Sequence, residues 1–304
     1  MDNTSNYYGT IMRQEIVIEK IFTIHYFEYT KDFYFPGEAH DFWELLYVDN
    51  GVVDVVTDNN HYSLFKGDLI FHKPGEFHNL RADGKTAPNL VVISYSCSSP
   101  ASEWFSGKIL RVSERERTLI AQIIHEAQRA FCSPLDDPKS NGLVRFEDSP
   151  FGCENMIKLY LEQMLICLIR RDTDISVREQ ISSSINQRTK ERAFNKVVNF
   201  LEDNMATDFH LDDICRSTGY SRSYLYQVFR ERTGRSVMEY HKRIKLEKTK
   251  QIIREGTHNF TQICDTLGFS SPQYFSKLFK RYTGLTPSEY SSSVKLKSEG
   301  YWES

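Results

Sequence analysis

The sequence predicts an α+β protein in which an N-terminal antiparallel β-barrel with flanking helices precedes an all-α domain. Residues 16–96 form short alternating segments separated by turn residues, a pattern typical of antiparallel strands. Residues 211–284 contain an internal repeat whose apolar residues recur at helical spacing. The formal charge also changes sign between these regions, although the whole chain of 304 residues carries only −3. We therefore expect two domains of different class and different charge.

Six segments supply the strands of the predicted barrel: IVIEKIFTIHYFEY, WELLYVD, VVDVVTD, HYSLF, LIFHKP and NLVVISYS. Between them lie the turn sequences DNG at 49–51, DNN at 58–60, KGD at 66–68 and PGE at 74–76. Glycine and asparagine accept the positive φ angles that tight turns require. Short strands at regular spacing with such turns favour a sandwich or a barrel.

Two helical segments follow the strands, at about 114–131 and 154–171. The second is apolar on nearly all sides, so it is expected to be buried on more than one side. One side would pack on the barrel, and another would pack on a second copy of the chain. The alternative is an internal helix of a monomer.

The charge asymmetry appears when the chain is divided at the polar stretch 172–187. Residues 1–187 hold 18 Lys and Arg against 27 Asp and Glu, a formal charge of −9, whereas residues 188–297 hold 20 against 12, or +8. A basic domain of this size is expected to attract polyanions such as nucleic acid, although a basic surface without a ligand is an alternative.

Composition excludes several classes of protein. The chain is 40% hydrophobic and 26% charged, which does not fit collagen, wholesale disorder or a membrane bundle. The N-terminus lacks the apolar stretch of a secretory signal, and MLICLI at 164–169 is far shorter than the ~20 residues that span a bilayer. The six cysteines form no CxxC pair, so they indicate neither a zinc ribbon nor a redox dithiol. We expect a cytoplasmic protein that has no membrane segment.

The repeat consists of ICRSTGYSRSYLYQVFRERTG at 214–234 and ICDTLGFSSPQYFSKLFKRYTG at 263–284. Each copy predicts a short helix, a turn at glycine and a second helix that a serine caps, Ser221 in the first copy and Ser271 in the second. The apolar residues of the second helices recur at i, i+3, i+4 and are expected to be buried: Leu225, Val228, Phe229, Phe275, Leu278 and Phe279. The sequence therefore predicts two helix–turn–helix motifs, at about 211–234 and 260–284.

The stretch 236–255 predicts a long helix between the two motifs. Twenty helical residues span about 30 Å, close to the ~34 Å that separates successive major grooves on one side of DNA. It also carries six Lys and Arg between 242 and 254, which can meet water or phosphate. Two motifs held at this distance suit DNA binding, whereas a helical repeat that binds protein is the alternative.

Residues 190–292 resemble the DNA-binding domain of the AraC/XylS family of bacterial transcription regulators. The family pattern of the second motif and its tail is matched by Phe260, Ile263, Cys264, Gly268, Phe269, Tyr274, Phe275, Phe279, Lys280, Gly284, Thr286, Pro287 and Tyr290. Tyr240 and Arg243 match the pattern of the connecting helix. The departures, such as cysteine for alanine at Cys215 and Cys264, concern packing.

The resemblance implies which residues contact double-stranded promoter DNA. The family's base-reading positions fall on Arg222, Ser223, Tyr226 and Gln227 in the first motif, and on Gln273, Ser276 and Lys277 in the second. Contacts to phosphate or packing roles fall to Arg230, Tyr274 and Lys280. An outward polar residue that is simply solvated is the alternative at each position.

The segments HDFWE at 40–44 and GDLIFHKPGEFH at 67–78 resemble the two motifs of cupin barrels, in which three histidines and a glutamate bind a metal. His40, Glu44 and His78 match three of these positions, whereas Phe42 stands in place of the second histidine. Regulators of the resembling family usually have cupin-like sensor domains without a metal. We therefore expect no cofactor and no metal, with a site of two histidines and a carboxylate at His40, Glu44 and His78 as the alternative.

The resemblance to cupins also implies a small-molecule effector, such as a sugar, bound inside the barrel. The residues expected to bind it are His40, Trp43, Glu44, Tyr47 and His78. His25 and His72 are expected to be strand-face residues with no special role. Core packing is the alternative for each aromatic residue.

Together these expectations describe a one-component transcription regulator and not an enzyme. We expect a cupin-like effector-binding and dimerisation domain at 1–171, a linker at 172–189 and an AraC-type DNA-binding domain at 190–297. The resemblance implies a homodimer that activates transcription by recruiting RNA polymerase, and repression is not excluded. The alternatives are a metal-dependent cupin enzyme fused to a DNA-binding domain, and a regulator without an effector.

Overall fold

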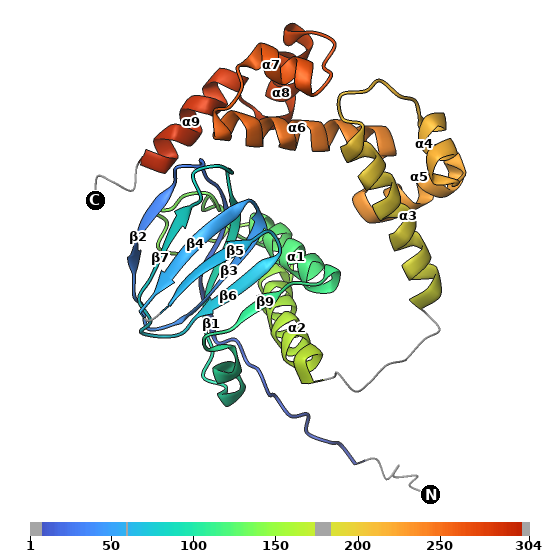
Figure 1. The fold of residues 1–304 in the computed structure, drawn as a ribbon. Helices are drawn as coiled ribbons and strands as arrows, with labels where there is room; N and C mark the ends of the chain where they lie inside the picture. The colour runs from blue at the N-terminus through green and yellow to red at the C-terminus, as the bar shows by residue number, and fades with distance from the viewer. Residues whose placement is uncertain (1–7, 59, 174–183, 300–304) are drawn as a thin grey trace, which may run out of the picture. The chain divides into compact units, whose positions relative to one another are not determined.

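The computed structural model describes residues 8–58, 60–173 and 184–299 (Figure 1). The chain divides into two compact units. The N-terminal unit contains nearly all strand residues of the described ranges, and the C-terminal unit contains the helices from Ser184 onward together with residues 29–34 and 82–87. None of the helices within the described ranges is long and apolar enough to cross a membrane.

The N-terminal unit consists of two antiparallel sheets that face each other (Figure 1). The five-stranded sheet has the order β1 (Lys20–Glu28), β8 (Asn89–Ser96), β3 (Trp43–Asn50), β6 (Asp68–His72) and β9 (Ile109–Arg111). The four-stranded sheet has the order β2 (Tyr34–Glu38), β7 (His78–Ala82), β4 (Val52–Thr57) and β5 (His61–Phe65). The predicted fold class is confirmed, because short antiparallel strands form a cupin-like barrel that helices flank.

Helices α1 (Glu114–Ala130) and α2 (Cys153–Thr173) cover one face of the five-stranded sheet. Because side chains alternate along a strand, β3 sends Trp43, Leu45 and Tyr47 into the core shared with these helices. The helices fill this core with Leu119, Ile120, Ile123, Ile157, Leu161, Met164, Leu165 and Leu168. Glu44 and Leu46 belong to the opposite face of β3, which turns toward the four-stranded sheet.

The C-terminal unit consists of seven helices among the described residues. They are α3 (Ser184–Asp203), α4 (Leu211–Thr218), α5 (Arg222–Thr233), α6 (Val237–Glu255), α7 (Phe260–Thr266), α8 (Pro272–Thr283) and α9 (Pro287–Glu299). The pairs α4–α5 and α7–α8 lie at the two predicted helix–turn–helix motifs, and the long helix α6 joins them.

Each helix–turn–helix motif has its own hydrophobic core, and α6 contributes to both. Val237 at the start of α6 packs with residues of α3, α4 and α5, such as Val197, Ile214 and Phe229. Leu246, Ile252 and Ile253 farther along α6 pack with residues of α7, α8 and α9. One continuous helix therefore fixes the spacing of the two motifs.

Local chemistry explains why the motifs turn where they do. Gly219 ends α4 with a left-handed backbone at φ 77°, and the Ser221 side chain then caps α5 by accepting from the Tyr224 amide at 3.3 Å. Ser271 caps α8 in the same way. Gly268 has φ 62°, and a Cβ atom there would lie 2.3 Å from the carbonyl oxygen of Ala206. Any side chain at this position would clash with that backbone.

The predicted linker at 172–189 is helical at both ends. Helix α2 continues to Thr173, and α3 begins at Ser184. Residues 174–183 of the predicted linker lie outside the described residues.

Candidate DNA-binding surface and barrel site

The predicted DNA-binding residues lie on the outer faces of α5 and α8, which we call the recognition helices. Leu225, Val228 and Phe229 are buried in α5, which leaves the opposite side of the helix in solvent. Phe275, Leu278 and Phe279 orient α8 in the same way. Ser276 is partly buried, and the other predicted residues are exposed: Arg222, Ser223, Tyr226, Gln227, Arg230, Gln273, Tyr274, Lys277 and Lys280.

Several of these side chains already have partners in the DNA-free chain. Arg222 forms a two-bonded ion pair with Asp212 of α4, in which the Nε–H group donates to Oδ1 at 2.6 Å. This guanidinium lowers the pKa of Asp212. The Gln227 amide donates to Glu231 at 2.8 Å, and Arg230 donates to the Gly234 carbonyl at 2.7 Å. Base readout by Arg222 or Gln227 must therefore exchange an internal contact for one with DNA.

A basic groove between the recognition helices was only partly anticipated from the sequence. It has a volume of about 320 Å³, and the residues that line it come from the ends of α5 and α8, the turn after α5 and the first half of α6. Its cations are Arg230, Arg235, Lys242, Arg243 and Arg281. The run of Lys and Arg after residue 242 indicated the contribution of α6, whereas Arg235 and Arg281 join it only through the tertiary fold.

In the barrel, Glu44 is the centre of a polar cluster that links the two sheets. Its Oε1 lies 3.2 Å from His78 Nε2 of β7, and its Oε2 lies 3.6 Å from His40 Nε2, in the loop after β2. Oε2 also accepts a hydrogen bond from the Ser94 hydroxyl at 2.9 Å, and Thr23 donates to Ser94 at 2.9 Å. Three of the five predicted effector-binding residues thus meet at one point.

Charge and burial oppose each other at Glu44. Burial alone would raise the pKa of this carboxyl, but the two adjacent imidazoles outweigh it and hold the pKa well below its usual range. At His78, burial would lower the pKa of the ring, and the contact with Glu44 more than reverses this effect, so the pKa is raised. The carboxylate is therefore ionised inside the barrel.

Backbone carbonyls orient the two imidazoles. His40 Nδ1 lies 3.0 Å from the carbonyl oxygen of Phe42, and His78 Nδ1 lies 3.2 Å from that of Glu76. The Phe42 ring stacks on His40 with centroids 3.9 Å apart and on Phe22 with centroids 4.2 Å apart. The residue that replaces the second cupin histidine thus holds His40 in place.

The sequence prediction missed two residues of this cluster, Glu38 and His72. Glu38 ends β2, and the ligand atoms of Glu38, His40, Glu44 and His78 all lie within 4.8 Å of one another. Its segment, YFPGE, contains proline and glycine and gave no strand signal. His72 faces the same space because it pairs directly with Glu44 across β3 and β6.

His72 lies on a strand face, as expected, and its ring packs inside the barrel. It is 1% exposed, its ring stacks on that of His78 with centroids 4.0 Å apart, and its Nδ1 lies 3.4 Å from a Glu76 carboxylate oxygen. Burial lowers the pKa of this ring. His25 is also buried, and its Nδ1 lies 3.3 Å from the Leu135 carbonyl oxygen.

The structure contradicts the prediction that Trp43 and Tyr47 share a site with Glu44. Both are buried in the core beneath α1 and α2, on the other face of β3. The reason is the two-residue period of a strand, which sends residues 43 and 47 to the side opposite residue 44. Burial in this core also raises the pKa of Tyr47 to about 12.

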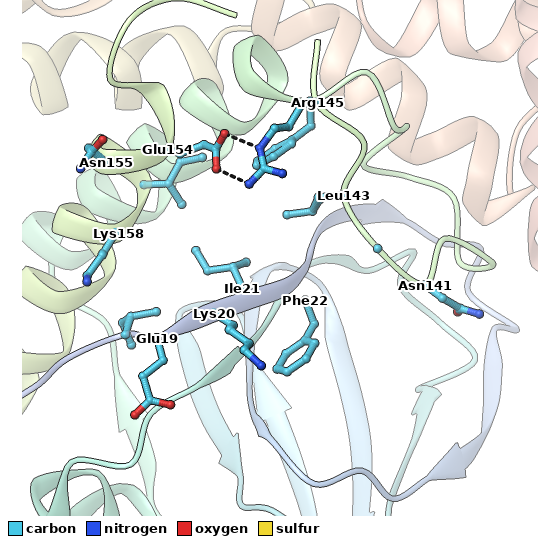
Figure 2. Close-up of a pocket in the computed structure, with 14 residues that line it drawn as sticks. Glu19, Lys20, Ile21, Phe22, Asn141, Leu143, Arg145, Glu154, Asn155 and Lys158 are labelled. Atoms are coloured by element: carbon cyan, nitrogen blue, oxygen red, sulfur yellow. Dashed lines mark hydrogen bonds and ion pairs between the residues drawn. The ribbon is translucent and has the colours of Figure 1, made fainter. Parts of the chain in front are cut away.

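A separate cavity of about 630 Å³ lies between β1, the segment around residues 141–145 and the start of α2 (Figure 2). Arg145 and Glu154 face each other on one side of it and form a two-bonded ion pair at 2.7 and 2.8 Å. Apolar side chains such as Ile21, Phe22 and Leu143 line another part of its wall. None of the barrel cluster's residues lines it, although Phe22 stacks on Phe42.

Comparison with known protein families assigns both units. Residues 22–128 match the model of the AraC-like ligand-binding domain, and residues 214–293 match a helix–turn–helix domain model. The chain is an AraC-type regulator. It is a DNA-binding transcription regulator with a ligand-binding domain and not an enzyme, so the alternative of a metal-dependent cupin enzyme is excluded.

The regulator is similar to transcription activators of enteric bacteria. It is 23% identical to the HTH-type transcriptional activator RhaR of Shigella flexneri over 272 residues, which cover 84% of the regulator and 86% of the relative. RhaR of Escherichia coli is 22% identical over the same length. Among solved structures, ToxT from Vibrio cholerae is 16% identical, with 90% of the regulator and 96% of that chain covered and a TM-score of 0.34.

Proposed function

We propose that the regulator is a homodimeric transcription activator that binds promoter DNA with both recognition helices and responds to a small molecule in its barrel. The observation that carries this proposal is the pair of exposed polar faces on α5 and α8, each backed by its own core and joined by the single helix α6. Two such helices can enter successive major grooves on one side of a DNA duplex.

In this proposal, α5 and α8 each contribute some residues that contact bases and others that contact phosphates. Arg222, Ser223, Tyr226 and Gln227 contact bases in one groove, and Gln273, Ser276 and Lys277 in the next. Arg230, Tyr274 and Lys280 contact phosphates. Arg and Gln suit this task because each forms paired hydrogen bonds with a base edge, Arg with guanine and Gln with adenine.

The basic groove between the recognition helices would hold the phosphate backbone between the two major grooves. Arg235, Lys242, Arg243 and Arg281 are exposed there, and they join Arg230 in lining one hollow. Phosphate contacts of this kind position the protein without selecting a sequence, and they make binding salt-dependent. This groove supports a DNA ligand over the alternative of a protein-binding helical repeat.

The effector would occupy the space between the two sheets, next to His40, Glu44 and His78. Donors and acceptors gather there on a strand face that is otherwise apolar, as in small-molecule sites generally. This polarity suits a hydroxyl-rich molecule such as a sugar. Because Trp43 and Tyr47 point away, recognition would rest on hydrogen bonds more than on stacking.

Dimerisation would use the outer side of α2 and the residues just before it. Leu159 is 55% exposed on α2, and Phe151, Phe146 and Val144 are exposed nearby in the chain. Large apolar side chains grouped on a surface are typical of a contact with another protein. We propose 1–171 as the sensing and dimerisation domain, 172–189 as the linker and 190–297 as the DNA-binding domain.

Fluorescence anisotropy with DNA from upstream of the regulator's own gene tests the proposal. Specific binding should survive scrambled competitor DNA and weaken steeply with salt. Transcription from that promoter with purified RNA polymerase should then rise when the regulator is added. Equal affinity for promoter and scrambled DNA would contradict site-specific binding, and reduced transcription would contradict activation.

A further inference from the structure

We propose that the barrel binds one divalent transition-metal ion through Glu38, His40, Glu44 and His78. The cluster combines two imidazoles and two carboxylates from β2, the loop after it, β3 and β7. Each residue offers one ligand atom, and these four atoms lie within 4.8 Å of one another. A site of this composition goes beyond the proposed effector function, because it requires an ion and not an organic molecule.

The first argument comes from the two buried ring nitrogens that lie near Glu44. A backbone carbonyl only accepts hydrogen bonds, so the Nδ1 atoms of His40 and His78 that face carbonyls must carry hydrogen. The other nitrogen, Nε2, is then the ring atom available to bind a metal. Both Nε2 atoms are buried and lie near a Glu44 oxygen, 3.2 Å away for His78 and 3.6 Å for His40, and neither has an aligned hydrogen-bond partner among the described residues. Two buried ring nitrogens without an aligned partner, next to a buried carboxylate, form a set of ligand atoms that a cation can satisfy.

The second argument is that neighbouring groups fix the orientation of the ligand side chains, as is usual around bound metals. A histidine that binds a metal through one nitrogen commonly donates its other N–H to a carbonyl, which fixes the ring. Here the Phe42 ring stacks on His40 and the His72 ring stacks on His78, each within 4.0 Å. Glu44 is oriented by the hydrogen-bonded chain from Thr23 through Ser94. These supports fix His40, Glu44 and His78, whose ligand atoms lie within 4.8 Å of one another and of that of Glu38.

Distances and ligand types define the class of ion. Bonds of about 2.1 Å place two ligand atoms on one ion at most about 4.2 Å apart, so a closure of less than 1 Å would complete the site. Glu38 is exposed and can supply that movement, whereas Glu44 and His78 are buried. Imidazole ligands favour zinc, iron, nickel or copper over calcium and magnesium. The exposed Glu38 also marks the side from which the ion would enter.

Metal binding does not depend on the proposed effector. A further role, in which the ion presents an open coordination position to the effector, rests on the proposed function. The two can fail separately, because metal content and DNA binding are measured on the same protein by different methods.

The test uses the full-length, tag-free chain, stripped with a chelator, reduced and then titrated with zinc chloride by calorimetry. We expect one equivalent per chain by elemental analysis after desalting, together with a rise in Tm. Glu44→Gln and His78→Gln should each weaken binding at least tenfold, a loss within the range for substitutions around metal sites. His61→Gln, which changes an exposed histidine of β5 outside the cluster, should bind zinc as the unchanged chain does.

Three results would overturn the metal site: a folded chain that retains no zinc, binding that survives both substitutions, or binding that His61→Gln removes. Circular dichroism establishes that each variant is folded. If Glu44→Gln does not fold, Glu38→Gln replaces it, since this exposed residue contributes little to the core. Substitution by cobalt gives an independent signal, because a site with His and carboxylate ligands should produce visible absorption that is absent in His78→Gln. DNA binding of the same samples tests the proposed function separately.

Discussion

Arg222, the first residue of recognition helix α5, is held by Asp212 of the preceding helix α4 through two hydrogen bonds. The pair belongs to the face that the regulator would present to DNA. The Asp212 carboxylate would also lie close to DNA phosphates, which carry the same negative charge. The DNA-free regulator therefore keeps its leading arginine in a contact that binding has to break.

Asp212→Asn should tighten DNA binding about two- to fivefold, because the substitution removes the exposed ion pair and frees Arg222. Anisotropy at constant salt measures the change. Asp265→Asn removes the same charge from exposed α7 without releasing a recognition-helix arginine, so it should have a smaller effect. Weaker binding by Asp212→Asn would mean that Asp212 positions Arg222 for DNA.

Gln227→Ala should cost roughly 1–3 kcal/mol on the preferred site and reduce discrimination against other sequences. The reason is that a glutamine can form a pair of hydrogen bonds with one base edge. Lys280→Ala, at the end of the second motif, should instead weaken binding to all sequences alike. Competition between promoter and scrambled DNA separates the two effects, and equal losses on both DNAs for Gln227→Ala would exclude base readout.

Replacing both Arg235 and Lys242 by alanine should reduce the slope of log affinity against log salt by about 2, since each phosphate contact contributes about 0.9. Both residues line the basic groove. Lys248→Ala is the matched control, because Lys248 is exposed on α6 but does not line this groove. An unchanged slope in the double variant would mean that the phosphate backbone does not contact this groove.

His241 makes the stability of the chain depend on pH. It is 6% exposed in α6 beside the Phe209 ring, and burial, with the charge of Lys245, lowers its pKa to about 4. Between the unfolded pKa of about 6.5 and the folded value, the unfolded chain binds a proton that the folded chain does not. The free energy of unfolding should therefore fall as the pH drops through this range, by about 3 kcal/mol in all.

Urea unfolding at pH 7.5 and pH 5 measures this effect. His241→Gln should flatten the dependence on pH, whereas His258→Gln, at an exposed histidine in the same unit, should leave it in place. If His241→Gln keeps the full dependence, another group is responsible.

Leu159→Asn should shift the regulator from dimer to monomer, as measured by sedimentation velocity across protein concentration. The expected cause is the loss of an apolar side chain that a second copy would bury. Phe65→Asn removes an apolar residue of β5 that is also 55% exposed, and it should not change the association. A regulator that is monomeric at all concentrations would exclude this interface.

Local signals made the DNA-binding unit predictable, whereas the barrel site depends on strand register. Gly219, Ser221 and Ser271 act on the backbone within a few residues, so the pattern alone fixes where the helices begin and end. β3 is buried on both faces, and its run of apolar residues does not reveal which way Glu44 points. That direction follows from pairing with His72 and Ser94, which lie far away in the sequence. The same dependence on pairing explains why Glu38 and His72 were missed.

Because side chains alternate along β3, this strand connects the barrel interior on one face of the sheet with the helix-covered core on the other. Glu44 turns toward the barrel interior, while its chain neighbours Trp43 and Leu45 turn toward α1 and α2. Hydrogen bonds to β6 and β8 hold the strand on both edges, so it resists sliding by itself. A displacement of the Glu44 carboxylate would therefore act on the same peptide groups that position Trp43 against α1 and α2. In the proposed sensing role, the effector contact at Glu44 and the residues packed against the helices therefore lie within three consecutive residues.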